Sequence, residues 1–272
     1  NELHIPVTEE ENMPKEIILE RMTWPKVGKA IEEGYDTAVF ACGATEQHGL
    51  HLPLFVDAEH VERIALVVAR RLRKALVAPS IRVGCSEHHM TFPGTLSILP
   101  ETLEALVRDY CVSLSRHGFR NICIIPTHGG NFAPIAVMLD RLREAVGPGT
   151  RLFAFTDLEG MMKAWRNAVQ EENGLGDRVG GHADIAESSI MMVLHPELVD
   201  KNIAEPGFTD PVTPEVLDRM FKEGLQNLTP NGVMGDPRGM SVSIGLRCID
   251  TFAGLISDFF ADQIREVTED PC

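Results

Sequence analysis

Apolar and polar positions follow one another along the chain in blocks that predict alternating strands and helices. Residues 38–42 form an apolar run of strand length that ends at Gly43. From about residue 58 to 76, apolar side chains recur every three or four positions, which predicts a helix with one buried face. Further strands are predicted at 77–83, 121–126 and 151–155, and further helices from Pro100 to Gly118, from Asn131 to the break at Gly147, at 185–194 and over about 241–265.

This order of elements predicts an α/β fold, specifically a single-domain three-layer α/β/α sandwich with a mostly parallel sheet. The segment 121–126 is almost wholly apolar, which is typical of a parallel strand buried on both faces. Residues 171–181 are polar and rich in Gly, which predicts a loop. Residues 1–20 carry six Glu and one Lys without periodicity, so they are predicted to form an acidic N-terminal arm ahead of a domain over residues 21–272.

Composition narrows the possible functions. The 272 residues are 44% hydrophobic and 24% charged, which excludes global disorder. Lys and Arg number 25 against 40 Asp and Glu, so the formal net charge is -15 and the surface repels phosphate backbones and anionic lipid. No apolar run in the sequence approaches the roughly 18–20 residues that span a bilayer. The six cysteines are scattered without a C-x-x-C pair. We therefore expect a cytoplasmic protein without nucleic-acid or membrane partners.

Polar, histidine-rich clusters follow the predicted strands, and ligands of open α/β sheets bind beyond the carboxyl ends of the strands. The clusters cover residues 43–57, 86–95, 127–131 and 180–187. Seven of the ten histidines lie in or beside them, which weakens the ordinary interpretation of a lone His as a surface or core residue. Cys42 and Cys85, near the same edge, are interpreted as buried inert thiols rather than nucleophiles.

The residue types in these clusters favour a metal site. Glu46 and His48 stand two positions apart in an extended segment, so they point to the same face and can hold one ion or two neighbouring ions. Asp57 can bridge two ions, because each of its oxygens can face a different metal. His128, from another strand end, completes a mixed nitrogen and oxygen set suited to Zn²⁺ or Mn²⁺. On spacing alone, the alternative is a polar rim of hydrogen-bonded loops.

The clusters resemble the motifs of the creatininase family of metal-dependent amidohydrolases. Residues 43–57 follow the pattern G-x-x-E-Q-H-G-x-H-L-P-x-x-x-D of its first motif. The later motifs are matched by His89-x-x-Phe-Pro-Gly-Thr95, by His128-Gly-Gly-Asn131, by residues 181–189, and by a C-terminal segment at 232–237. The resemblance spans roughly residues 22–260 in the family's order. It implies the three-layer fold, a divalent metal site at the strand ends, usually a hexamer, and a small-molecule substrate.

The resemblance also implies roles for individual residues. Four positions match the family's metal ligands: Glu46, His48, Asp57 and His128, with Asp57 in the bridging place. Creatininase itself takes a further ligand Glu from the position of Gly130, so Glu187 is the predicted substitute for completing a second site. His182 matches a histidine placed near the substrate for proton transfer, and we expect it to act in catalysis together with Glu187. Three residues of the motifs are expected to contact substrate: His89, Thr95 and Asn131.

Helical geometry supports the pairing of His182 with Glu187. If a helix begins near Asp184, Glu187 lies in its first turn, where the helix dipole favours a carboxylate, and His182 lies just outside it. The alternative is that His182 only caps the helix and Glu187 pairs with Arg178 or another base.

Three functions stay open from the sequence. The first is metal-dependent hydrolysis of a small cyclic amide, a formamide or a related C–N bond by activated water. The second is hydrolysis of a C–C bond in a cyclic ketone or inosose on the same site, and the third is a catalytically inactive metal-binding relative. His88 stands where the family commonly has Glu, and Thr127 precedes His128 where Gly is usual, so both departures weigh against creatinine itself as the substrate.

Overall fold

The computed structural model describes residues 16–269 and contains two sheets. The larger sheet is parallel with strand order β2-β1-β3-β4. Its strands are β1 (Thr37–Cys42), β2 (Ala75–Val77), β3 (Asn121–Pro126) and β4 (Arg151–Ala154). The smaller sheet pairs β5 (Val179–His182) with β6 (Met234–Gly235) in antiparallel fashion. The predicted mostly parallel α/β sheet is therefore confirmed.

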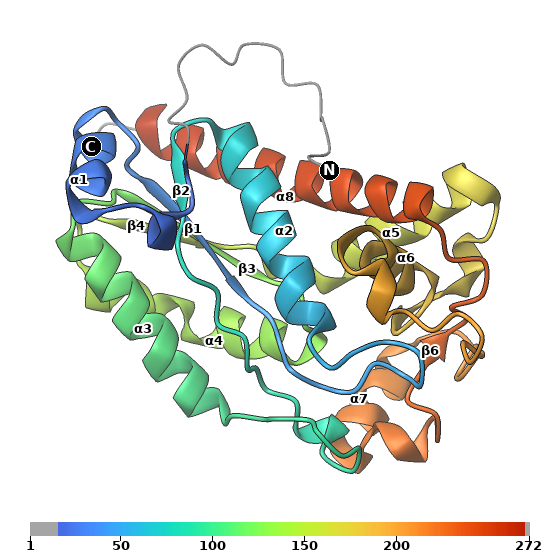
Figure 1. Cartoon of the computed structure of the whole chain (residues 1–272). Helices are drawn as coiled ribbons and strands as arrows, with labels where there is room; N and C mark the ends of the chain where they lie inside the picture. Colours follow the sequence, from blue (N-terminus) through green and yellow to red (C-terminus); the bar gives the residue numbers. More distant parts are fainter. Residues whose placement is uncertain (1–15, 270–272) are drawn as a thin grey trace.

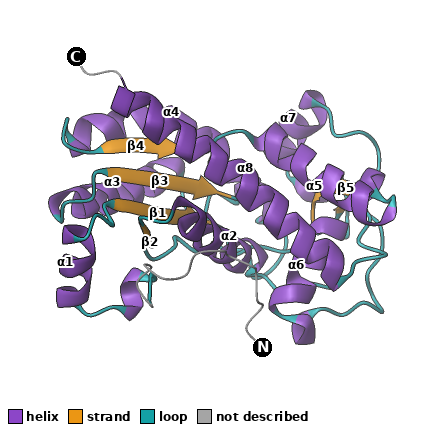
Figure 2. Ribbon diagram, turned by 90° about the horizontal axis from the view of Figure 1, so that it is seen from above, coloured by secondary structure: helices purple, strands orange, loops and turns teal. Residues whose placement is uncertain are grey.

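Helices cover both faces of the parallel sheet. Figure 1 shows α2 and α8 on one face and α3 and α4 on the other, and Figure 2 shows α8 running along the molecule towards α5 and α6. The helices are α1 (Trp24–Glu32), α2 (Val56–Leu72), α3 (Pro100–Arg116), α4 (Gly129–Val146), α5 (Leu158–Asn173), α6 (Ile185–Leu194), α7 (Pro214–Glu223) and α8 (Val242–Glu269). Single 3-10 turns lie at Leu19–Arg21, Glu87–His89, Gly176–Arg178, Pro196–Leu198 and Leu225–Asn227. All residues of β1 and β3 are buried because both faces of these central strands carry helices.

The structure corrects several predicted boundaries. The second strand ends at Val77 instead of residue 83, since Pro79 has no N–H to donate and only an isolated bridge at Ile81 follows. The helix predicted over 58–76 begins two residues earlier, at Val56, and ends at Leu72. The segment 171–181 is not a plain loop, because it holds the end of α5, a 3-10 turn and the start of β5. The sequence patterns also did not predict α5 and α7.

The N-terminal segment packs onto the sheet edge where the structure describes it. Residues 1–15 of the predicted acidic arm lie outside the described residues. Ile17 is buried, its carbonyl accepts a hydrogen bond from the N–H of Val77, and Ile18 bridges the same residue. None of the described helices is long and apolar enough to cross a membrane.

Asn131 ties three backbone segments together at the carboxyl edge of the sheet. The helix predicted to start at Asn131 begins at Gly129, with His128 at the N-cap position and Asn131 in the first turn of α4. The side-chain oxygen of Asn131 accepts from the N–H of Cys85 at 3.0 Å. Its amide nitrogen donates to the carbonyls of Cys42 at 3.2 Å and Gly43 at 3.0 Å. The end of β1, the chain after β2 and the start of α4 are thereby fixed relative to one another.

We predict that Asn131→Ala lowers the free energy of unfolding by about 3 kcal/mol, because the part-buried N–H of Cys85 and the buried carbonyl of Gly43 lose this partner and the carbonyl of Cys42 keeps only the N–H of Thr127 at 3.4 Å. Chemical denaturation followed by circular dichroism measures this loss. Asn173→Ala is the matched control, since exposed Asn173 accepts one surface hydrogen bond from Leu175 and its loss is worth less than about 1 kcal/mol. Equal effects of the two substitutions would contradict the structural role of Asn131.

Candidate metal centre

Polar side chains from five segments converge at the carboxyl edge of the parallel sheet, where the sequence predicts a ligand site. The structure brings the predicted metal and catalytic residues together: Glu46, His48, Asp57, His128, His182 and Glu187. Glu46 and His48 lie in the loop after β1, Asp57 in the first turn of α2 and His128 at the N-terminus of α4. His182 ends β5, and Glu187 lies in the first turn of α6. All six side chains are buried.

Asp57 is common to two of three groups of possible ligands, as Glu46 and His48 also are, and the group without Asp57 joins Glu46, His48 and His182. Of the two groups with Asp57, one joins it to Glu46 and His128, and the other joins it to His48 and Glu187, with ligand atoms within 4.8 Å of one another in each group. Asp57 Oδ2 lies 3.6 Å from His48 Nε2 and also 3.6 Å from His128 Nδ1. Such a shared carboxylate has the geometry expected of a ligand that bridges two cations.

Unpaired buried atoms show that these residues fit a divalent cation. Both carboxylate oxygens of Glu46, the Nε2 atom of His48 and the Oδ2 atom of Asp57 are buried without a hydrogen-bond partner. A polar atom buried in this way costs free energy unless something compensates it. A cation bound among them would compensate all four atoms at once. The mixed nitrogen and oxygen set, without thiolates, suits Zn²⁺ or Mn²⁺.

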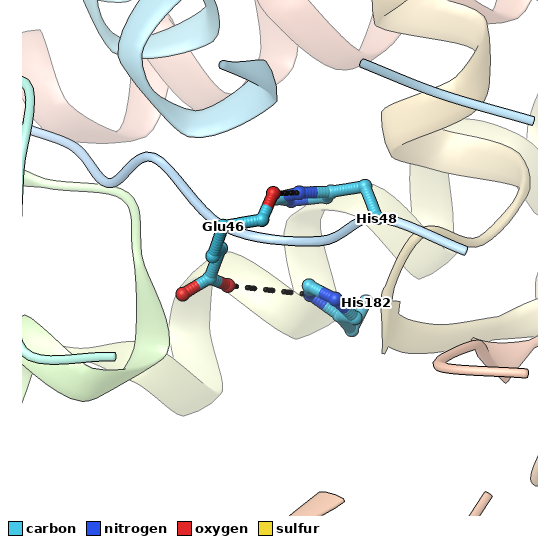
Figure 3. A group of neighbouring side chains, drawn as sticks. All are labelled: Glu46, His48 and His182. Carbon is cyan, nitrogen blue, oxygen red and sulfur yellow. Dashed lines mark hydrogen bonds and ion pairs between the residues drawn. The ribbon is translucent and has the colours of Figure 1, made fainter. Parts of the chain in front are cut away.

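Backbone carbonyls orient the candidate histidine ligands. His48 Nδ1 donates to the carbonyl of Glu46 at 3.0 Å, as Figure 3 shows, so its Nε2 lone pair faces the carboxylates. Burial lowers the pKa of His48 to about 4, which keeps this ring neutral. His128 Nε2 donates to the carbonyl of Cys85 at 3.0 Å, so its Nδ1 faces Glu46 Oε1 at 3.3 Å. Ligating histidines in proteins are commonly held by such a hydrogen bond from the second ring nitrogen.

Local geometry at the start of α6 places Glu187. Asp184 caps the helix by accepting from the N–H groups of Ala186 and Glu187. The Glu187 carboxylate accepts from the N–H of Ala183 at 2.6 Å, and its Oε2 lies 3.7 Å from His48 Nε2. Ala183 has a φ of 52°, a left-handed conformation that costs a non-glycine residue about 1 kcal/mol and that turns its N–H towards this carboxylate.

The alternative interpretation of this segment is not what the structure shows. Asp184, rather than His182, caps the helix. Arg178 donates to the carbonyl of Arg238 and lies 3.7 Å from Asp236, so it is engaged away from Glu187. His182 lies outside the helix, with Nδ1 3.7 Å from Glu46 Oε1 (Figure 3).

The buried carboxyl and imidazole groups of the site have pKa values shifted in different directions. Burial, together with the charge of Glu46, raises the pKa of Asp57 to about 8. Burial and then the charge of Asp57 raise the pKa of Glu187 well above its usual range. Burial also opposes ionisation of Glu46, but His128 and His89 outweigh it and hold that pKa well below its usual range. Burial opposes protonation of His128, yet Glu46 outweighs it and raises that pKa to about 9.

The three predicted substrate contacts are all buried and differ in what they contact. His89 lies in the site, with Nε2 3.3 Å from Glu46 Oε1. The hydroxyl of Thr95 accepts from the backbone N–H of Gln47 at 3.2 Å. The polar atoms of Asn131 are directed at the backbone. Substrate contact by these three residues stays a prediction.

Two further residues of the site were not predicted from the sequence. Gln47 lies between two site histidines, and its place between Glu46 and His48 in the first motif was the available signal. Phe221 of α7 packs against the His88 ring, with centroids 4.6 Å apart, and the sequence carried no signal for it because α7 itself was not predicted.

The cysteines near the site are inert, as the sequence analysis suggested. Cys42 is fully buried, and burial raises its thiol pKa far above the usual range. Burial raises the pKa of Cys85 to about 11, so neither thiol supplies a thiolate at neutral pH.

A parallel sheet with a buried carboxylate and histidine cluster at its carboxyl edge defines an α/β protein suited to a divalent metal ion. The family described as "Creatininase: Creatinine amidohydrolase" matches residues 20–260, and the chain belongs to this family of hydrolases. A mycofactocin precursor peptide peptidase of Mycolicibacterium smegmatis is 30% identical over 228 residues, covering 82% of each chain. A creatinine amidohydrolase of Pseudomonas putida is 30% identical over 198 residues, covering 69% of this chain and 75% of that protein.

A solved structure shares the fold. The crystal structure of creatinine amidohydrolase (creatininase) matches with a TM-score of 0.73 at 24% identity, covering 92% of this chain and 98% of that chain. The predicted α/β fold class and the resemblance to the creatininase family are both confirmed.

We predict that cation affinity rises with pH. In the metal-free protein Asp57 holds a proton up to about pH 8, whereas a carboxyl in the unfolded chain releases it near pH 4, so its burial destabilises the metal-free fold as pH rises through this interval. A cation must displace that proton and the one on His128. Isothermal titration of Zn²⁺ into metal-free protein should give an affinity that is higher at pH 8 than at pH 7 by about tenfold or more. Binding that does not change between these pH values would contradict the proton competition.

Proposed function

We propose that this chain hydrolyses the C–N bond of a small cyclic amide, a formamide or a related amide with the help of divalent metal. The observation that carries the proposal is Asp57, a buried carboxylate shared by two groups of ligands that contain unpaired atoms. A divalent cation held there lowers the pKa of a water molecule towards neutrality and polarises a carbonyl oxygen. The donor set of the site suits one or two ions of Zn²⁺ or Mn²⁺.

The two proposed ion positions use different residues of this chain. Glu46, Asp57 and His128 would hold one ion, and His48, Asp57 and Glu187 would hold the other. Gly130 cannot contribute a side chain, because a Cβ there would lie 2.1 Å from the carbonyl oxygen of Cys85 and 2.6 Å from His128 Nε2. Glu187 on α6 would supply a carboxylate to the second position instead.

The remaining residues are proposed to handle protons and substrate. His182 takes a proton from the attacking water and delivers it to the leaving nitrogen as the C–N bond breaks, so that water and amide give a carboxylic acid and an amine. Burial, followed by the nearby His48, lowers the pKa of His182 to about 3, which leaves the ring neutral at the pH of the reaction. Glu187 supports this step from its place beside His48. His89 and Thr95 are proposed to contact the substrate, and Asn131 holds the backbone at the edge of the site in place.

Comparison with relatives favours C–N over C–C hydrolysis. The two curated relatives are named as a peptidase and an amidohydrolase, and both names describe cleavage of amide C–N bonds. A panel of lactams, formamides, short peptides and cyclic ketones, assayed with Zn²⁺-loaded and Mn²⁺-loaded protein, tests this choice. Turnover of cyclic ketones alone would select the C–C reaction, and no turnover with bound metal would select an inactive relative. A homohexamer in the cytoplasm stays a prediction.

We predict that Asp57→Ala abolishes turnover and lowers metal content more than any other single ligand substitution, because both ion positions lose a ligand. Elemental analysis after dialysis measures the metal per chain. Glu187→Gln should remove about one ion and keep the other, since it belongs to one group only. Asp109→Ala, at an exposed position of α3, is the control and should keep the full metal content. An Asp57→Ala variant with full occupancy would show that this carboxylate does not bridge.

We predict that His182→Ala keeps its metal while kcat falls by about 10²–10⁴-fold, the usual size of the effect when a proton-transfer group is lost. Steady-state kinetics on the best amide of the panel measures the change. His195→Ala is the matched control, because this partly exposed His pairs with Glu59 away from the ligand groups. Near-normal turnover of His182→Ala would remove His182 from the mechanism.

A further inference from the structure

The side chain of Gln47 connects two histidines of the site with a distant loop. Its Nε2 atom lies 2.9 Å from His89 Nδ1 and 2.9 Å from His182 Nε2, and it donates to the carbonyl of Gly232 at 3.2 Å. Its Oε1 atom accepts from the backbone N–H of Gly49 at 2.9 Å. An N–H group can only donate, so this last contact fixes which end of the amide is oxygen and which is nitrogen.

The hydrogens available around Gln47 select one arrangement of the two rings. His182 Nε2 also lies 2.8 Å from the backbone carbonyl oxygen of Gln47, which can only accept. The three acceptors are this carbonyl, the carbonyl of Gly232 and His89 Nδ1. The three hydrogens are the two on the Gln47 amide nitrogen and one on His182 Nε2. The two amide hydrogens reach the Gly232 carbonyl and His89 Nδ1 only if His89 carries no hydrogen on Nδ1, and the Gln47 carbonyl receives one only if His182 carries its hydrogen on Nε2. The 2.9 Å contact between Gln47 Nε2 and His182 Nε2 is then a close approach of two donors and not a hydrogen bond.

This arrangement gives the two histidines opposite roles. His182 then presents a bare Nδ1 to the ligand cluster, 3.7 Å from Glu46 Oε1. His89 presents an N–H at Nε2, 3.3 Å from Glu46 Oε1. One ring can accept a proton and the other can only donate a hydrogen bond, although both are buried beside the same carboxylate.

The surroundings hold Gln47 closely in place. A Cβ on Gly232 would lie 2.0 Å from Gln47 Oε1, and the φ of +75° at Gly232 is one that side chains disfavour, so only glycine allows the loop this close. From the other side, the backbone N–H of Gln47 donates to the hydroxyl of Thr95. Gln47 itself is buried, with 5% of its surface exposed. The amide therefore cannot turn to offer its oxygen to His89.

We propose that Gln47 is a positioning residue that sets the tautomers of both active-site histidines, with its side-chain amide acting on His89 and its backbone carbonyl acting on His182. This rests on the proposed hydrolase function, in which His182 accepts the proton of the attacking water. His89 Nε2–H then serves as the donor that steadies Glu46 or the substrate oxygen. Hydrogen-bond partners of this kind decide which imidazole nitrogen is free to react.

Nitrogen NMR of the histidine rings tests the proposal directly. In ¹⁵N-labelled protein loaded with diamagnetic Zn²⁺, and in the metal-free form, the ring shifts report which nitrogen carries hydrogen, and His89→Gln and His182→Gln assign the signals. We expect hydrogen on Nε2 of both rings in the unaltered protein. We expect Gln47→Met to remove the Nε2 preference of His89 and to lower kcat by about 10- to 100-fold. Gln47→Glu, which offers an acceptor in place of the amide hydrogens, should move the hydrogen of His89 to Nδ1.

Gln170→Met is the matched control, because exposed Gln170 likewise accepts from a glycine N–H, that of Gly176, but contacts no histidine. It should leave both ring spectra and kcat unchanged. Hydrogen on Nδ1 of His89 in the unaltered protein, or an unchanged His89 tautomer in Gln47→Met, would overturn the proposal. The spectra need no turnover, so a failure of the proposed reaction would be seen separately, as correct tautomers in a protein that hydrolyses no amide.

Discussion

Two carboxylates, Glu46 and Asp57, are buried side by side at the end of the parallel sheet, and the surrounding structure is organised around their charge. Burial, followed by the charge of Glu46, raises the pKa of Asp57 to about 8, whereas His128 and His89 outweigh the effect of burial on Glu46 and hold its pKa well below its usual range. Protonated His128 supplies part of the compensation, and the free lone pair of neutral His48 faces Asp57. The unpaired oxygens and nitrogen that remain are the physical reason to expect a divalent cation at this point of the fold.

Much of this arrangement could be predicted from sequence, because the relevant signals are local. The apolar run at 121–126 and the helical pattern at 185–194 coincide with β3 and α6. The polar clusters follow strand ends, and the parallel topology brings them to one edge. Asp184 likewise indicates the start of the helix that carries Glu187, since short acidic side chains commonly cap helices.

Other features could not be predicted because they depend on contacts between distant segments. Gln47 meets Gly232, which lies 185 positions away, and nothing near either residue signals the contact. Asn is a residue type that commonly caps helices. The side chain of Asn131 instead bonds to Cys42, Gly43 and Cys85 from other segments, and these bonds outweigh the local preference. α7 buries only Met220 among its residues, so its pattern predicts little, yet it places Phe221 against the site.

The links made by Asn131 have a consequence for how the centre meets a cation. They connect the backbones that lead to Glu46, to His128 and to the turn holding His89, so these donors cannot drift apart one at a time. The conformational entropy of assembling the ligands is then lost during folding of the sheet edge, and little of it remains to be lost when an ion arrives. Such preorganisation favours ions that match the existing geometry over those that require the donors to move. Departure of an ion would leave the donors in place to receive the next.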